Sequence, residues 1–268
     1  MDPTQFRQHV QNDDTMLGMG IQYPAESIIE SIGHMWDFLW LDGQHGQISY
    51  ERMLSMVRTA DLVGVDTVVR VPGHESGTLG LYADMAPSAI MVPMINTAED
   101  ARAAVEAVRF PPLGSRSFGG RRPIDTMGRT YYLEKEPLLI AQIETRQAIE
   151  NCEEIASTDG VDLLMLGPDD LKTQLGLAID SPLLDTPELL QCLNKVVRAA
   201  DKAGKGAMCI ATTPELLKYA YGLGYRIFIG SSDVYLLRQG SQESARKLRG
   251  AVDSESSVTV ENNVKVHV

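Results

Sequence analysis

Eight short apolar runs, spaced along the chain, limit most strongly what this sequence can fold into. Most of them are followed by a segment with helical periodicity. Most also lack strict alternation of apolar and polar residues, which is typical of strands buried on both faces of a parallel sheet. The runs cover residues 15–23, 37–42, 67–72, 88–94, 138–144, 162–167, 206–211 and 226–231.

The segments between the runs begin and end as helices do. "NTAEDARAAVEAVRF" (96–110) opens with an Asn or Thr cap and acidic residues, and "TPELLQCLNKVVRAADKAG" (186–204) starts with Thr, Pro and Glu and ends on Gly. Eight strand–helix units in 268 residues predict an α/β fold, a (β/α)8 TIM barrel, with an open doubly wound sheet as the alternative. We expect residues 1–250 to form this single domain and residues 251–268 to form a polar C-terminal tail.

The composition of the chain indicates which kinds of partner and which cellular compartment to expect. The net charge of −12 argues against nucleic-acid binding, because phosphate neutralisation needs clustered Lys and Arg. No stretch of 18 or more apolar residues is present, and "MDPTQFRQHVQNDD" lacks the layout of a signal peptide, so we expect no membrane span. The three cysteines (Cys152, Cys192, Cys209) form no CxxC pair, which fits a reducing, cytoplasmic compartment.

Polar side chains gather at one end of the predicted barrel. In a barrel of this kind the active site lies at the C-terminal ends of the strands. The residues with catalytic or ligating chemistry follow those ends: Asp42 and His45 after the second run, Arg70 at the third, Glu144 at the fifth, and Asp169 and Asp170 after the sixth. Four strand ends that bring together acid, base and cation predict an active site.

Glu144 and Asp170 predict a metal site. They belong to adjacent strands that carry no nearby Cys or His ligand, and Mg²⁺ and Mn²⁺ prefer oxygen ligands and often keep several waters. Two protein carboxylates therefore suffice, with the remaining positions open to a chelating substrate. Taken singly, a glutamate at a strand end is more often an ion-paired rim residue, and an aspartate at a helix start is more often a cap.

The motif "GPDDL" (167–171) has the form of a helix start after a strand. The free N–H groups of Asp169 and Asp170 would point outward there, and such helix N-termini bind carboxylates or phosphates. Gly167 permits close approach of the backbone, and Pro168 fixes the entry dihedral without donating a hydrogen bond. We therefore expect this motif to bind substrate.

The stretch "FPPLGSRSFGGRRPIDTMGRTYYLEKE" (110–136) breaks the rhythm of strands and helices. Inserts of this length are uncommon unless they have a function. Its segment "GSRSFGGRR" lacks the Lys-Ser/Thr ending of a P-loop and does not run from a strand directly into a helix. We expect a lid or a subunit contact rather than a nucleotide site.

Six motifs, taken in their order and spacing, carry a resemblance to a known family. They are "LDGQHG", "RVP", "MVPMINTAEDA", "RFPPLGSRSFG", "QIET" and "DGVDLLMLGPDDL". Together they resemble the HpcH/HpaI aldolases, class II metal-dependent pyruvate aldolases that include hydroxy-oxo-heptanedioate and 2-keto-3-deoxy sugar acid aldolases. The likeness extends over residues 15–250.

The resemblance implies how substrate and cofactor are held. A divalent ion, Mg²⁺ or Mn²⁺ with Co²⁺ as a further candidate, would bind to Glu144 and Asp170. Pyruvate would chelate that ion, and Gln142 together with the backbone of Asp169 and Asp170 would help to seat it. The second substrate would be an aldehyde.

The resemblance also implies catalytic roles and an assembly. His45 would be the base, Asp84 would raise its basicity, Arg70 would stabilise the enolate or the oxyanion of the aldol, and Asp42 would support the same network. Members of the family are typically homo-oligomers, often hexamers, with the last helix packed across a subunit pair. We therefore expect a hexamer or trimer of dimers.

Two places depart from the family pattern. Gln44 stands where many relatives carry an acid before the histidine, which removes a charge near the base. The sequence "RVPGHES" (70–76) differs from the commoner continuation that contains Trp and Asn, so the acceptor pocket is expected to differ too.

Three alternative functions remain open from the sequence. A lysine Schiff base could replace the metal, but Lys135 and Lys205 precede strands and only Lys172 follows a strand end. The same metal–enolate centre could decarboxylate oxaloacetate or form bonds as macrophomate synthase does. The chain could also be a non-catalytic barrel that binds a 2-oxo acid, although the complete set of site residues argues against this.

Overall fold

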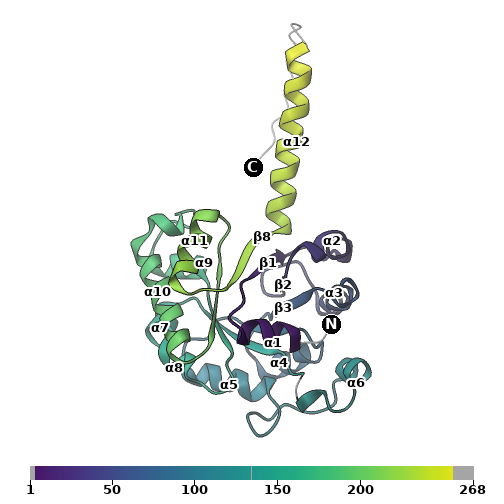
Figure 1. The fold of residues 1–268 in the computed structure, drawn as a ribbon, viewed down its shortest axis with the longest axis vertical. Coiled ribbons are helices and arrows are strands. Elements are labelled where there is room, and N and C mark those ends of the chain that lie inside the picture. The colour runs from purple at the N-terminus through teal and green to yellow at the C-terminus, as the bar shows by residue number, and fades with distance from the viewer. Residues whose placement is uncertain (1–3, 134, 256–268) are drawn as a thin grey trace. The chain divides into compact units, whose positions relative to one another are not determined.

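The computed structural model describes residues 4–133 and 135–255. Eight parallel strands close into a barrel in the order β1 to β8, with helices around them (Figure 1). This confirms the predicted (β/α)8 barrel and excludes the open sheet. The strands are β1 (Met16–Ile21), β2 (Phe38–Asp42), β3 (Asp66–Arg70), β4 (Ala89–Val92), β5 (Leu138–Ile143), β6 (Leu163–Leu166), β7 (Gly206–Ile210) and β8 (Ile227–Ser232).

Helices follow the strands, so each crossover is of the βαβ type expected for parallel pairing. The barrel helices are α1 (Thr4–Gln11), α2 (Glu26–Ile32), α3 (Tyr50–Val63), α4 (Ser76–Ala83), α5 (Ala98–Val108), α6 (Arg121–Met127), α7 (Arg146–Glu150), α8 (Cys152–Ala156), α9 (Pro168–Leu175), α10 (Pro187–Lys202) and α11 (Pro214–Leu223). Short 3-10 turns lie at Gly33–Met35, Tyr131–Leu133 and Leu183–Asp185.

The start of α5 shows why these boundaries were predictable. The Thr97 side chain accepts a hydrogen bond from the backbone N–H of Asp100, and the Asp100 carboxylate accepts one from the backbone N–H of Thr97. This reciprocal capping box satisfies two donors that the first turn cannot use. At α11, Thr213 caps the N–H of Leu216 in a related way.

Aromatic rings fill the interior of the barrel from β2. Phe38 and Trp40 both point inward, and Phe6 of α1 packs on Phe38 with ring centroids 5.7 Å apart. A Cβ at Gly18 would lie 2.3 Å from the Phe38 ring, and a Cβ at Gly20 would lie 3.1 Å from Trp40 Cε3. Strand β1 therefore has glycine, with no side chain, at two positions that face the barrel interior. Trp40 occupies the layer directly below the C-terminal mouth.

The stretch 110–136 contains regular secondary structure in part of its length. It contains α6 and the 3-10 turn Tyr131–Leu133, and Phe110 packs edge-on against Tyr131 with ring centroids 5.7 Å apart. Phe118 stacks on Tyr131 at the same centroid distance. This aromatic cluster gives the segment a small apolar core of its own. Its predicted role as a lid or subunit contact stays a prediction.

Within the described chain, the contacts divide into two units, the barrel up to Asp233 and a second unit from Val234 onward. Helix α12 (Asp233–Glu255) enters this second unit. The predicted tail, residues 251–268, thus begins inside α12, and its residues 256–268 lie outside the described part of the chain. None of the described helices combines the length and apolar character needed to cross a membrane.

Candidate functional site

A cavity of about 440 Å³ opens at the C-terminal ends of the strands. Eight of the ten predicted site residues line it: His45, Arg70, Gln142, Glu144, Gly167, Pro168, Asp169 and Asp170. The barrel brings them together because parallel strands all end at the same rim. Asp42 lies behind Arg70, and Asp84 lies elsewhere.

Asp42 and Arg70 form a buried ion pair at the ends of β2 and β3. Arg70 Nε donates to Asp42 Oδ1 at 2.9 Å, and Nη2 donates to Oδ2 at 2.7 Å. Asp42 is fully buried and Arg70 is 6% exposed. Burial alone would raise the pKa of Asp42, but the hydrogen bonds and charge of Arg70 outweigh it and hold that pKa below its usual value. The pair is therefore ionised at neutral pH.

This bidentate pairing fixes the Arg70 guanidinium. Its face also lies over the Trp40 ring, with Cζ 4.5 Å from the ring centroid, which adds a cation–π contact. Among the described residues Nη1 has no hydrogen-bond partner, so it is the donor left for a ligand. The arrangement presents one oriented cationic donor to the cavity.

Asp42 also shapes the loop that carries His45. Its Oδ1 accepts hydrogen bonds from the backbone N–H groups of Gln44 and His45, each at 3.1 Å. Such a carboxylate-to-backbone turn holds the chain without using the His45 side chain. The imidazole is exposed at the mouth and lines the cavity, where it can exchange protons with both substrate and solvent.

Glu144 is held by two neighbours directly after β5. The backbone N–H of Met94 donates to its Oε1 at 2.7 Å, and the Gln142 amide donates to its Oε2. Glu144 is 1% exposed. Burial, together with the negative charge of Asp170, raises the pKa of Glu144 to about 7 despite these hydrogen bonds.

The surroundings of Glu144 fit a divalent cation. Gln142 Oε1 is buried with no hydrogen-bond partner, so a polar acceptor at the site has unused capacity. Gly167 packs so closely that a Cβ there would lie 2.8 Å from Glu144 Oε2. No group of three or more His, Cys, Asp or Glu side chains within residues 4–133 and 135–255 is arranged to hold an ion. Two carboxylates alone suit Mg²⁺ or Mn²⁺, which accept water and substrate oxygens for the rest.

The N-terminus of α9 forms the adjacent wall. Gly167 is the N-cap, Pro168 occupies the first turn, and Asp169 and Asp170 follow. The first N–H groups of a helix have no intrahelical acceptor, so this end can bind an anionic group. The predicted helix start is confirmed.

Asp84 does not line this cavity. It is the C-cap of α4, and its Oδ1 accepts a hydrogen bond from Arg116 Nη2 at 2.6 Å. Arg116 is 6% exposed and its guanidinium lies over the Phe110 ring. Within the described chain Asp84 therefore anchors the stretch 110–136, and its assistance to His45 stays a prediction.

Sequence reasoning missed several lining residues. Gln22, Trp40, Thr212, Ser231 and Ser232 come from β1, β2, β7 and β8 or follow their ends. The serines were visible as the polar ending of "RIFIGSS", whereas Trp40 is an apolar residue inside a strand and looks like any core residue.

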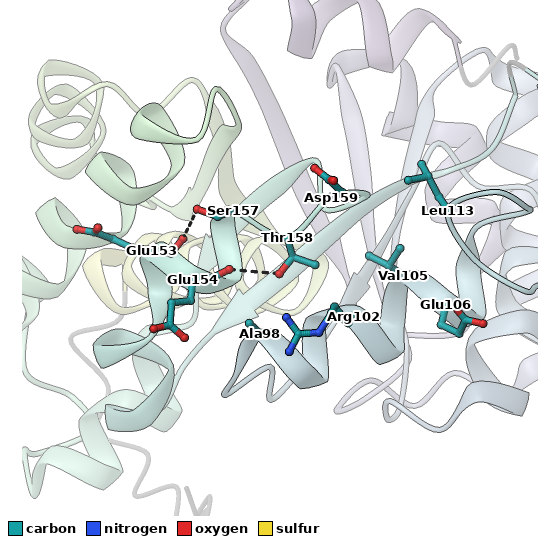
Figure 2. Close-up of a pocket in the computed structure, with 10 residues that line it drawn as sticks. All are labelled: Ala98, Arg102, Val105, Glu106, Leu113, Glu153, Glu154, Ser157, Thr158 and Asp159. Carbon is teal, nitrogen blue, oxygen red and sulfur yellow. Dashed lines mark hydrogen bonds between the residues drawn. The ribbon is translucent and has the colours of Figure 1, made fainter.

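A larger surface hollow of about 720 Å³ lies between α5 and α8 (Figure 2). Figure 2 shows Ser157 and Thr158 bonded back to the carbonyl oxygens of Glu153 and Glu154, as helix-end hydroxyls commonly are. None of the predicted site residues lines it. The hydroxyls of Ser157 and Thr158 are therefore satisfied within their own helix end, and we assign the hollow no chemistry.

Known proteins resemble this chain over three quarters of its length or more. The 4-hydroxy-2-oxovalerate aldolase of Novosphingobium aromaticivorans is 30% identical over 94% of this chain and 97% of its own. A hydroxypyruvate/pyruvate aldolase of Rhizorhabdus wittichii is 32% identical over 76% of this chain and 83% of its own.

Solved structures of the same family also resemble this chain. An HpcH/HpaI aldolase/citrate lyase family protein from Burkholderia cenocepacia superposes with a TM-score of 0.83 at 27% identity, covering 91% of this chain and 99% of its own. The profile of the HpcH/HpaI aldolase/citrate lyase family matches residues 24–219. The chain belongs to the HpcH/HpaI aldolase/citrate lyase family.

Proposed function

We propose that this enzyme is a class II aldolase that reversibly joins pyruvate, or a related 2-oxo acid, to an aldehyde with the help of a divalent ion. The observation that carries the proposal is the carboxylate pair Glu144 and Asp170 in one cavity with Arg70 and His45. The names of relatives support it, since they are 4-hydroxy-2-oxovalerate and hydroxypyruvate/pyruvate aldolases.

Glu144 and Asp170 would hold the cation, Mg²⁺ or Mn²⁺ with Co²⁺ as a further candidate. When bound, it supplies a Lewis acid that withdraws charge from the 2-oxo acid and so favours enolate formation. Gln142 and the N-terminus of α9 would orient the substrate carboxylate, because unpaired N–H groups of Asp169 and Asp170 attract an anion. Gly167 would permit close approach of the backbone, and Pro168 would fix the entry dihedral without donating a hydrogen bond.

Arg70 and His45 would carry the proton and charge transfers. In the cleavage direction an imidazole nitrogen of His45 removes the proton from the aldol hydroxyl, the adjacent carbon–carbon bond breaks, and its electron pair forms the enolate. Arg70 Nη1 donates to the oxygen on which charge develops, and Asp42 keeps the guanidinium oriented. Return of a proton to the enolate carbon gives pyruvate and the aldehyde.

Assembly and location are part of the proposal. We expect a homo-oligomer, a hexamer or trimer of dimers, because the family resemblance implies it, and a cytoplasmic location, because the three cysteines form no CxxC pair. The test is the size of the full chain in solution by light scattering.

Chelation tests the metal. EDTA should abolish retro-aldol activity, and Mn²⁺ or Mg²⁺ should restore it. Lys172 offers no rival centre, because its Nζ donates to the Ile179 carbonyl at 2.9 Å and lies 3.4 Å from Asp169 Oδ1. Activity that survives in metal-free protein, or trapping of substrate by borohydride, contradicts the proposal.

Oxaloacetate decarboxylation would use the same residues, since it also leaves the enolate of pyruvate. Product analysis with oxaloacetate and with a panel of aldehydes separates the two activities. Enolate formation without turnover of any aldehyde favours the decarboxylase. Pyruvate binding without solvent exchange of its methyl protons would identify a non-catalytic barrel.

A further inference from the structure

A buried carboxylate at the end of β8 holds the chain that follows β1. Asp233 comes directly after β8, is the first residue of α12 and is 1% exposed. The backbone N–H of Gln22 donates to Asp233 Oδ1 at 3.0 Å and to Oδ2 at 3.2 Å, and the N–H of Tyr23 donates to Oδ2 at 3.0 Å. A buried carboxylate is unfavourable unless it is hydrogen-bonded, so these contacts fix the backbone after β1.

The sheet itself does not pair these two backbone N–H groups. The ladder between β1 and β8 ends at Gly20 and Ser232, and the ladder between β1 and β2 ends one residue later. Gln22 and Tyr23 lie beyond both ladders, where an unpaired N–H would be unfavourable. The Asp233 side chain therefore continues the contact between β1 and β8 past the end of the strands.

Gln22 contacts both polar elements of the proposed catalytic site. Its Nε2 donates to Asp42 Oδ2 at 3.3 Å, and the same oxygen accepts from Arg70 Nη2. Its carbonyl oxygen accepts from the backbone N–H of Gln47 at 2.8 Å, in the loop that carries His45. The position of this one residue therefore affects the arginine and the histidine together.

The loop of His45 packs tightly against the backbone of Gln22. A Cβ at Gly46 would lie 3.2 Å from the Gln22 carbonyl oxygen and 2.3 Å from the Asp42 carbonyl oxygen. Only a glycine permits so close an approach of two backbone segments. A displacement of Gln22 would therefore displace the loop as well.

We propose that Asp233 and Gln22 are positioning residues for the proposed catalytic groups. Asp233 fixes the backbone of Gln22. The Gln22 side chain then holds Asp42, which orients Arg70, and its carbonyl oxygen holds the loop of His45. Misplacement of a reacting group by a fraction of an ångström lowers a rate, so these contacts belong to the reaction as well as to the fold. This inference rests on the proposed aldolase function and adds two residues to its site.

Gln22→Met tests the side-chain contact, because it keeps the length of the side chain and removes the donor. The assay is exchange of pyruvate methyl protons with D₂O by Mn²⁺-loaded full-length protein, which needs the enolate but no aldehyde. We expect the exchange rate at saturating pyruvate to fall about tenfold, as for one hydrogen bond lost in the transition state.

Two further quantities separate positioning from general damage to the fold. The pyruvate concentration at half-maximal exchange and the Mn²⁺ affinity from calorimetry should both equal those of the parent protein. The proposed ligands Glu144 and Asp170 follow β5 and β6, across the barrel from β1. Loss of Mn²⁺ affinity in parallel with the rate overturns the proposal, because it would show a purely structural role for Gln22.

Asp233→Asn tests the backbone contact. It replaces one acceptor oxygen with an NH₂ donor, which faces the N–H of Gln22 or Tyr23 unfavourably, so the exchange rate should fall about tenfold or more. The double variant Asp233→Asn/Gln22→Met should be no slower than Asp233→Asn alone, because both changes act through the same side chain. Losses that multiply, to about a hundredfold or more, overturn the proposal.

Asp37→Asn is the matched control. The Asp37 carboxylate accepts from the backbone N–H of Leu17 at 2.7 Å, at the opposite end of β1, and its loss should leave the exchange rate unchanged. An equal fall in this variant, or the parent rate in Gln22→Met, overturns the positioning roles. Gln22→Met decides the matter even where Asp233→Asn does not fold.

The same assay distinguishes this failure from that of the proposed function. Exchange in the parent protein combined with unchanged variants overturns only the positioning roles of Gln22 and Asp233. No exchange in the Mn²⁺-loaded parent protein overturns the aldolase function, and the positioning roles with it.

Discussion

The backbone N–H of Met94 donates to Glu144 Oε1 across 2.7 Å, from a residue whose φ is 58°. A non-glycine residue rarely adopts this left-handed conformation, which costs about 1 kcal/mol or more and persists where the surroundings impose it. Here it aims a donor at a proposed metal ligand. One carboxylate oxygen of Glu144 is thereby occupied, so the carboxylate cannot rotate freely.

The Asn96 side chain contacts both loops next to Glu144, the one that carries Met94 and the one that carries Thr145. Its Nδ2 donates to the Met94 carbonyl at 3.0 Å, and its Oδ1 accepts from the hydroxyl of Thr145, the residue after Glu144. Asn151 Nδ2 donates to the Asn96 carbonyl at 2.9 Å. The two loops that flank the carboxylate are therefore linked through one amide side chain.

Asn96→Ala should weaken Mn²⁺ binding about tenfold, because losing a few hydrogen bonds of about 1 kcal/mol each lets Glu144 sample unproductive orientations. Isothermal titration calorimetry of the metal alone measures this, without reference to activity. Asn12→Ala, at an exposed asparagine remote from the site, is the control. Equal affinities in the two variants would show that Asn96 has no positioning role.

Metal affinity should depend on pH through Glu144. Its pKa is about 7, and the ion binds only the carboxylate form, so each ion must displace a proton below that pH. The apparent association constant should rise about tenfold per pH unit up to pH 7 and then level off. Mn²⁺ titrations from pH 5.5 to 8.5 measure the profile, and Glu144→Gln should abolish the slope together with most of the affinity. A flat profile in the parent protein contradicts this assignment.

Strand ends were predictable because barrel topology leaves little freedom there. Once eight parallel strands close, the residues at or just after the ends of β2, β3, β5 and β6 must share a rim. The positions of the apolar runs therefore predict that Asp42, Arg70, Glu144 and Asp170 lie there. Their grouping needed only the strand count and the location of each strand end.

Other contacts depend on geometry that periodicity does not encode. The pairing of Asp84 with Arg116 joins a helix end to a loop 32 residues later. Trp40 packs closely against Gly20, where a Cβ would lie 3.1 Å from Trp40 Cε3, and the register of β8 against β1 shifts just before Ser231. The donor from Met94 depends on one left-handed backbone angle. None of these has a signature in a single sequence.

Glu144 should also destabilise the metal-free fold as pH rises. The unfolded carboxyl has a pKa near 4.5 and the folded one about 7, so between these values the native state binds more protons than the unfolded state. Stability from this group is thus fully present below about pH 4.5 and is lost as pH rises through 7, by about 3 kcal/mol in total. Urea denaturation in EDTA should show Glu144→Gln to be more stable than the parent at pH 8 but not at pH 5. A difference of the same size at both pH values would refute the linkage.

Removing the charge of Asp42 should affect both the fold and the reaction. Asp42→Asn leaves the buried guanidinium of Arg70 without its countercharge, and breaking a buried pair in this way costs about 3–5 kcal/mol. Arg70→Lys keeps a cation but loses the bidentate geometry, so it should lower kcat about 10²-fold or more while costing less stability. Urea midpoints and retro-aldol kinetics on both variants separate the two effects. Arg121→Lys, at an exposed pair with Asp125, is the matched control and should change neither quantity. If Arg70→Lys retained full kcat, the oriented Nη1 donor would have no part in the chemistry.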